Sequence, residues 1–118
     1  MDKDDNIVDE AEKLLLSSSS FSVDEIFRMM DGIGAAVPAH IDRTSYSIIS
    51  NLGFIPNISN LKTVEVSSTF IHNSFVDECI KKYKVITSSD AHHLGHINER
   101  INCLDLDDLD MIVDWMCK

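Results

Sequence analysis

Residues 83–92 read Tyr-Lys-Val-Ile-Thr-Ser-Ser-Asp-Ala-His, an apolar run followed at once by a carboxylate and an imidazole. The β-branched residues of this run predict a strand that ends near Ser89. Asp90 and His92 stand two residues apart, so on extended backbone their side chains point to the same side. The segment therefore predicts a strand whose carboxyl end carries an oxygen donor and a nitrogen donor.

Residues 33–43 show the same pattern, an apolar run followed by a polar pair, but here the histidine precedes the aspartate. Apolar residues 33–39 predict a strand, and His40 and Asp42 follow it with the same spacing. Imidazole and carboxylate groups are ligands that several divalent metal ions accept. Two strand ends that each offer a nitrogen and an oxygen predict a metal-assisted hydrolytic site.

Helical patterns alternate with these strands along the chain. We expect helices over residues 6–16, 22–32, 44–52, 75–83 and 107–117, and strands over residues 33–39, 61–67, 83–89 and 101–104. Ser22 and Glu25 form a capping box, and Asn73 or Ser74 is the expected cap of the fourth helix. This alternation is typical of an α/β fold with mostly parallel strands, whose functional residues lie at the carboxyl ends of the strands.

The serine run at residues 17–20 divides the chain into two parts. We expect an N-terminal helix and a Ser-rich linker over residues 1–20, followed by one domain over residues 21–118. Hydrophobic residues make up 44% and charged residues 25% of the chain, values that are ordinary for a folded protein. A chain of 118 residues is nevertheless short for an α/β barrel.

The composition excludes several classes of function. A net charge of -10 argues against nucleic-acid binding through a broad basic face, although a bound cation would allow a small anionic substrate. No apolar run approaches the ~20 residues that span a bilayer, and residues 1–5 lack the basic start of a secretion signal. Three widely spaced cysteines indicate neither a disulfide framework nor a zinc knuckle. We expect a cytoplasmic protein that binds neither nucleic acid nor membrane.

Four segments together resemble a known family. They read Gly-Ala-Ala-Val-Pro-Ala-His-Ile-Asp-Arg at residues 34–43, Leu-Gly-Phe-Ile-Pro at 52–56, Val-Glu-Val-Ser at 64–67 and Ile-Thr-Ser-Ser-Asp-Ala-His at 86–92. In this order they resemble the later part of the PHP (polymerase and histidinol phosphatase) superfamily. The family's opening His-x-His motif has no counterpart in the first 21 residues, and all five histidines lie at position 40 or later. The chain thus resembles the carboxyl-terminal half of a PHP domain.

The resemblance implies a fold, an activity and a set of ligands. The fold would be a partial (β/α) barrel, half of the distorted PHP barrel. The activity would be metal-dependent hydrolysis of a small phosphate ester, with zinc, manganese or iron as cofactor. His40, Asp90 and His92 correspond to metal ligands and are the expected catalytic residues. Glu65 corresponds to a strand glutamate that would lie beside the site and orient a ligand.

Two neighbours of His40 have more than one interpretation. Asp42 would either support a metal ligand, cap a helix that begins near Thr44, or pair with Arg43, and we favour the cap or the pair. Arg43 would either bind the phosphate of the substrate with its guanidinium or lie on the surface against Asp42.

Because the resemblance covers only half of a metal site, three interpretations of the chain's function are possible. Open edges of parallel strands favour association, so a second copy or a separate N-terminal half would complete the site. The rival interpretation is a non-catalytic PHP fragment that acts as an oligomerisation or partner-binding module. A third interpretation is that the chain is a piece of a longer protein, which would then carry the family's function.

Overall fold

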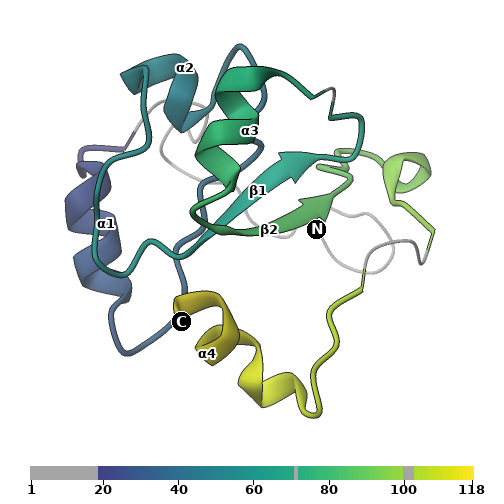
Figure 1. The fold of residues 1–118 in the computed structure, drawn as a ribbon. Helices are drawn as coiled ribbons and strands as arrows, with labels where there is room; N and C mark the ends of the chain where they lie inside the picture. The colour runs from purple at the N-terminus through teal and green to yellow at the C-terminus, as the bar shows by residue number, and fades with distance from the viewer. Residues whose placement is uncertain (1–18, 71, 100–102) are drawn as a thin grey trace, which may run out of the picture.

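The computed structural model describes residues 19–70, 72–99 and 103–118. Its elements are α1 (Val23–Met30), α2 (Ile48–Leu52), β1 (Thr63–Ser67), α3 (Ser74–Ile80), β2 (Lys84–Ser88), the 3-10 helices η1 (Leu94–His96) and η2 (Leu109–Met111), and α4 (Ile112–Cys117) (Figure 1). The helix expected over residues 6–16 lies outside the described residues. None of the described helices is long and apolar enough to cross a membrane.

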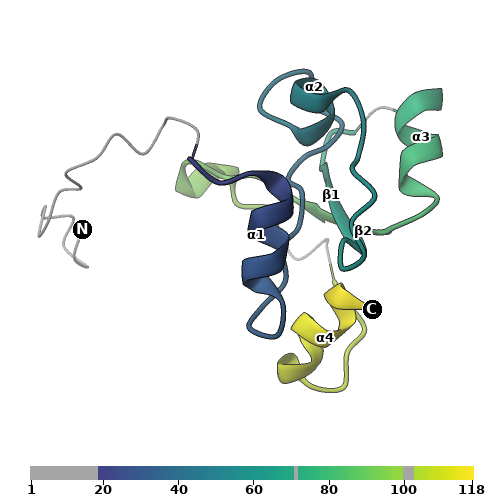
Figure 2. The same cartoon turned by 90° about the vertical axis from the view of Figure 1, so that its left-hand side faces the viewer.

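The two strands form a small parallel sheet. β1 pairs with β2 in a register that runs from Thr63 opposite Lys84 to Ser67 opposite Ser88, and α3 makes the crossover between them. Figure 2 shows α3 on one side of the sheet and α1 on the other. The described residues thus have the predicted α/β character, with parallel strands, and their sheet is not closed into a barrel.

The segment at residues 33–39 is not the regular strand that we expected. It lies beside β1, where Glu65 N–H donates to the carbonyl oxygen of Pro38 at 2.9 Å and Ile41 N–H donates to that of Glu65 at 2.9 Å. Pro38 has no N–H group, and His40 has a φ of 31°, which interrupts an extended strand. The segment therefore pairs with the backbone N–H and carbonyl groups of Glu65 on the outer edge of β1, but it does not form a regular strand ladder.

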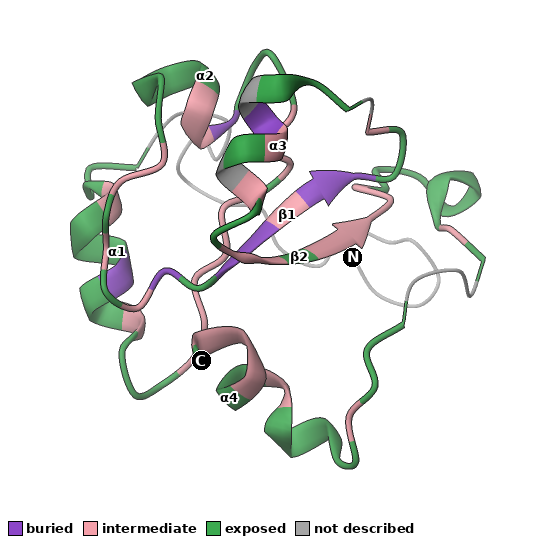
Figure 3. Ribbon diagram, in the orientation of Figure 1, coloured by how far each residue is buried: buried purple, intermediate pink, exposed green. Residues whose placement is uncertain are grey.

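The core is centred on β1. Its apolar members are Phe27, Ile41, Leu61, Val64, Val66 and Val76. Four of the five residues of β1 are buried, on both faces of the strand (Figure 3). The polar residues Thr63 and Ser67 are buried as well as Val64 and Val66. The Thr63 hydroxyl donates to the Met116 carbonyl at 2.7 Å, so α4 covers the beginning of β1.

Side-chain caps set the ends of three helices. The predicted capping box of Ser22 and Glu25 begins α1, and Asn73 Oδ1 accepts from Val76 N–H at the start of α3, as expected. The helix expected over residues 44–52 is shorter, because Ser47 is the cap of α2.

The carboxyl-terminal part also differs from the predicted pattern. A helix was expected over residues 107–117, and the structure has η2 followed by α4. Cys103 and Leu104 do not form the expected strand, and the first two residues of that segment, 101 and 102, lie outside the described ranges. Lys84 fixes α4, since its Nζ donates to the Trp115 carbonyl and lies 4.7 Å from the centre of the Trp115 ring.

Candidate functional site

Three predicted site residues gather at the carboxyl ends of β1 and β2. Arg43 Nη1 lies 3.2 Å from Asp90 Oδ2, and His40 Nε2 lies 4.0 Å from the same oxygen. We call His40, Arg43 and Asp90 the strand-end cluster. The sequence predicted that residues 33–43 and 83–92 would meet, and they do, although Arg43 rather than His92 is the third member.

Glu65 fixes the backbone that carries His40. Its carboxylate accepts from the backbone N–H of His40 at 3.2 Å, while its own backbone bonds to Pro38 and Ile41. His40 stands at a positive φ, which costs free energy for any residue other than glycine and needs tertiary support. Glu65 thus holds the backbone that carries His40.

Asp42 has a role that differs from the one we favoured. Its Oδ1 accepts from the backbone N–H of Ser67 at 2.7 Å, so it neither caps α2 nor pairs with Arg43. The physical reason is that the N–H of Ser67 points away from β2 and needs an acceptor where the strand ends. Asp42 closes the outer edge of β1 at this point.

Arg43 reaches across the ends of both strands. Its Nε donates to the Ser67 hydroxyl at 3.3 Å, and its Nη1 pairs with Asp90. The side chain is 46% exposed. A guanidinium carries five N–H donors, and these two contacts leave the others for a ligand from solvent. The surface pairing of Arg43 with Asp42 is wrong, and the anion-binding interpretation is compatible with this geometry.

His92 does not join the strand-end cluster. Its side chain is exposed, and its Nδ1 lies 2.8 Å from the backbone carbonyl oxygen of Asp90. Residues two apart share a side only on extended backbone, and Asp90 has a φ of 48°. The left-handed conformation of Asp90 therefore removes the premise that its carboxylate and the imidazole of His92 point the same way.

The donor groups of the described residues do not form a complete metal site. Among the residues that the structure describes, no three His, Cys, Asp or Glu side chains lie close enough together to hold an ion. A catalytic zinc site uses three protein ligands plus an open position. His40 and Asp90 provide at most two donors, so the described part of a single chain holds no complete site for zinc, manganese or iron.

One buried nitrogen atom of the strand-end cluster lacks a hydrogen-bond partner among the described residues. The His40 side chain is 13% exposed, and its Nδ1 is buried without a hydrogen-bond partner among the described residues. Buried polar groups are nearly always paired, and an unpaired one marks a place where a missing group would contribute. The other three described histidines, His72, His93 and His96, are exposed.

Ser67 is the site residue that sequence reasoning missed. Its N–H binds Asp42 and its hydroxyl binds Arg43, so it connects the segment after His40 to the end of β1. Ser67 is the last residue of a predicted strand, and this position could have indicated a site residue, because ligands bind at the carboxyl ends of strands in α/β sheets.

No family model, no curated protein and no solved structure matches the chain.

Proposed function

We propose that the chain supplies one side of a PHP-type phosphate-ester site and that a partner completes it. The observation that carries the proposal is the strand-end cluster: a half-exposed guanidinium stands at the carboxyl ends of two parallel strands, beside an imidazole and a carboxylate. In α/β folds this edge of the sheet is where ligands bind.

Arg43 is the proposed phosphate-binding residue. Guanidinium groups bind phosphate oxygens through paired N–H donors, which gives both affinity and orientation. Asp90 and Ser67 hold the guanidinium at one edge and leave its remaining donors free to face a ligand. The expected ligand is a small phosphate ester, because the acidic chain as a whole would repel a polyanion.

We assign hydrolysis of the phosphate ester to an assembly of this chain with a partner. Zinc, manganese or iron would be held jointly by His40 and Asp90 and by residues of a second copy or of a separate N-terminal half. The two donors that lie near each other and the unpaired Nδ1 of His40 support an incomplete site. No catalytic step is assigned to the isolated chain.

Phosphate-ester binding tests the role of Arg43 directly. Phenyl phosphate is titrated into the full chain, and NMR shifts of the amides at residues 40–43 and 88–92 report binding. We expect Arg43→Ala to weaken the affinity about tenfold or more, because a charge-assisted hydrogen bond contributes roughly 1.5–3 kcal/mol.

The matched control is Arg28→Ala, which removes an arginine from the surface of α1. The control should bind phenyl phosphate as the unaltered chain does. Equal binding by Arg43→Ala and the unaltered chain would overturn the proposed role, as would equal losses in both variants, which indicate only a general charge effect.

One observation favours a second candidate, a non-catalytic partner-binding module. β2 pairs with β1 along one edge, and no other described strand pairs with its second edge. Unpaired strand edges bind added strands. A stable oligomer that carries no metal and does not bind phenyl phosphate would favour this candidate.

A further inference from the structure

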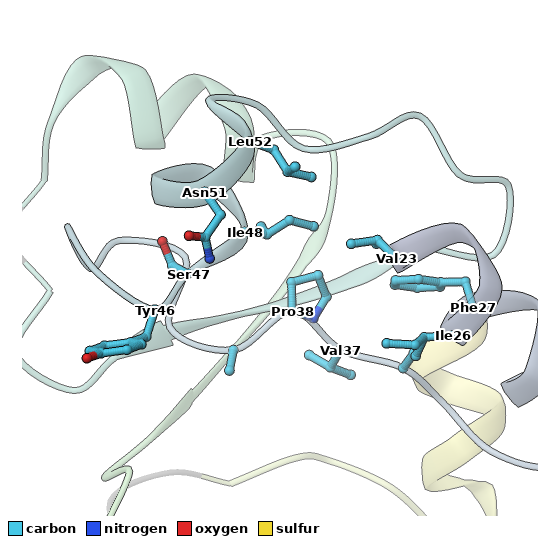
Figure 4. Close-up of a pocket in the computed structure, with 12 residues that line it drawn as sticks. Val23, Ile26, Phe27, Val37, Pro38, Tyr46, Ser47, Ile48, Asn51 and Leu52 are labelled. Atoms are coloured by element: carbon cyan, nitrogen blue, oxygen red, sulfur yellow. The ribbon is translucent and has the colours of Figure 1, made fainter. Parts of the chain in front are cut away.

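An apolar groove lies between α1, residues 36–39 and α2 (Figure 4). Its volume is about 330 Å³. Val23, Ile26 and Phe27 form one wall and Ile48 and Leu52 the opposite one, with Val37 and Pro38 between them. The groove is separate from the strand-end cluster and shares no residue with it.

The walls of the groove are apolar and partly open to solvent. Ile26 is 37% exposed and Leu52 is 43% exposed, whereas Phe27 is buried at the back. Apolar surface in contact with water costs free energy, so a segment that covers these side chains would stabilise the chain.

The chain contains a segment with matching chemistry. Residues 6–16 carry Ile7, Val8, Ala11, Leu14 and Leu15 at the spacing of one helical face, and Asp9, Glu10, Glu12 and Lys13 on the others. An isolated helix of this length is marginal in water, because helices shorter than about 12–15 residues need a packing surface. The segment therefore requires an apolar partner in order to be helical.

The segment that connects residues 6–16 to α1 is long enough for them to reach the apolar groove. Residues 17–22 separate the segment from Val23, which itself lines the groove. Six residues span up to roughly 20 Å when extended, and a helix of eleven residues is about 16 Å long. The four serines at positions 17–20 suit a turn between two helices.

We propose that residues 6–16 dock as an amphipathic helix in the groove between α1 and α2 of the same chain. The apolar face of the helix covers Ile26 and Leu52, and its acidic face remains in water. This contact is independent of the phosphate-ester site and concerns a different surface.

Amide hydrogen exchange of the full chain tests the proposal. We expect the amides of residues 7–16 to be protected at least about tenfold over the unfolded chain. Leu52→Glu places a charge in the groove wall and should abolish that protection. Leu94→Glu introduces the same charge on η1, where the leucine is 87% exposed, and should leave the protection unchanged.

A second variant covers the case in which Leu52→Glu disturbs α2. Leu15→Glu alters only the proposed helix, and it should abolish protection of residues 7–16 and shift the methyl signals of Ile26 and Ile48. Absence of protection in the unaltered chain would overturn the proposal. So would protection that persists in Leu15→Glu, or protection that depends on protein concentration, which indicates docking on a second copy.

Discussion

At the scale of single residues, side-chain acceptors hold the strand ends together. Glu65 accepts from His40 N–H and Asp42 accepts from Ser67 N–H, so each carboxylate binds a backbone group that the two-stranded sheet leaves unpaired. Leaving such a buried donor unsatisfied costs about 1–3 kcal/mol. These carboxylates therefore position the backbone around the strand-end cluster.

Removal of the Glu65 carboxylate should destabilise the chain. We expect Glu65→Ala to lower the free energy of unfolding by about 1–3 kcal/mol, because the His40 N–H loses its acceptor. Glu65→Gln keeps a carbonyl oxygen and should recover part of the loss. Urea denaturation measures both.

Glu78→Ala is the control for this prediction. Glu78 is exposed, and its carboxylate pairs with Lys81 just beyond the end of α3; such a surface pair contributes less than about 1 kcal/mol. A Glu65→Ala variant as stable as Glu78→Ala would contradict the assigned role of Glu65.

The candidate site was predictable in part from these residues. Sequence alone indicated that His40, Arg43 and Asp90 follow apolar segments, and strand ends converge in parallel sheets. It could not indicate the positive φ of Asp90, which depends on tertiary contacts and turns His92 away from the predicted direction. It also could not show that Ser67 needs Asp42 as an acceptor, because that need arises only when β1 is placed in the sheet.

At the scale of the elements, local signals were the most reliable. The first described helix begins at a capping box that is visible in the sequence, and α3 begins at the expected asparagine. The predicted strand at residues 33–39 fails because Pro38 cannot donate to a ladder. The predicted helix at 44–52 loses its first turn, since Tyr46 has a φ of 55° and Ser47 provides the cap.

The cap of α1 can be tested by Ser22→Ala. The Ser22 hydroxyl accepts from the backbone N–H of Glu25 at 3.3 Å. Loss of an N-cap serine costs about 1 kcal/mol, so the urea midpoint should fall accordingly. Ser22→Asp retains an acceptor at this position and should retain most of the stability, while equal stability of the alanine and aspartate variants would count against the cap.

The other half of this cap depends on pH. The Ser22 backbone N–H donates to the Glu25 carboxylate and, as the main cause, holds the pKa of Glu25 below its ordinary value of 4.5. A lowered folded-state pKa means that the stabilising contribution is present above the unfolded-state pKa and disappears as the pH falls through the folded-state value. The stability difference between the unaltered chain and Glu25→Gln should therefore shrink in acid.

Urea denaturation between pH 6 and about pH 3 measures this difference. Asp24→Asn is the control, since Asp24 lies in the same first turn and makes no capping-box contact. A stability difference that grows as the pH falls would contradict the assigned hydrogen bond between the Ser22 backbone N–H and the Glu25 carboxylate.

At the scale of the whole molecule, the part of the chain that the structure describes has an open sheet and an incomplete set of metal donors. Two parallel strands are covered by helices on both faces, yet the described residues bring together only two of the predicted metal ligands. The proposed resemblance to half of a PHP domain predicts the same incompleteness, because the first 21 residues carry no counterpart of that family's opening His-x-His motif. We therefore propose that groups outside the described residues complete the site.

Metal content measured together with solution mass tests the central claim most directly. The purified full chain is separated by size, and each fraction is analysed for zinc, manganese and iron, for mass by light scattering, and for hydrolysis of a generic phosphodiester. We predict that monomeric fractions hold far less than one metal ion per chain and are inactive, and that metal and chelator-sensitive turnover occur only in fractions with the mass of an assembly. A monomer that carries one or more ions per chain and turns over substrate would contradict the claim.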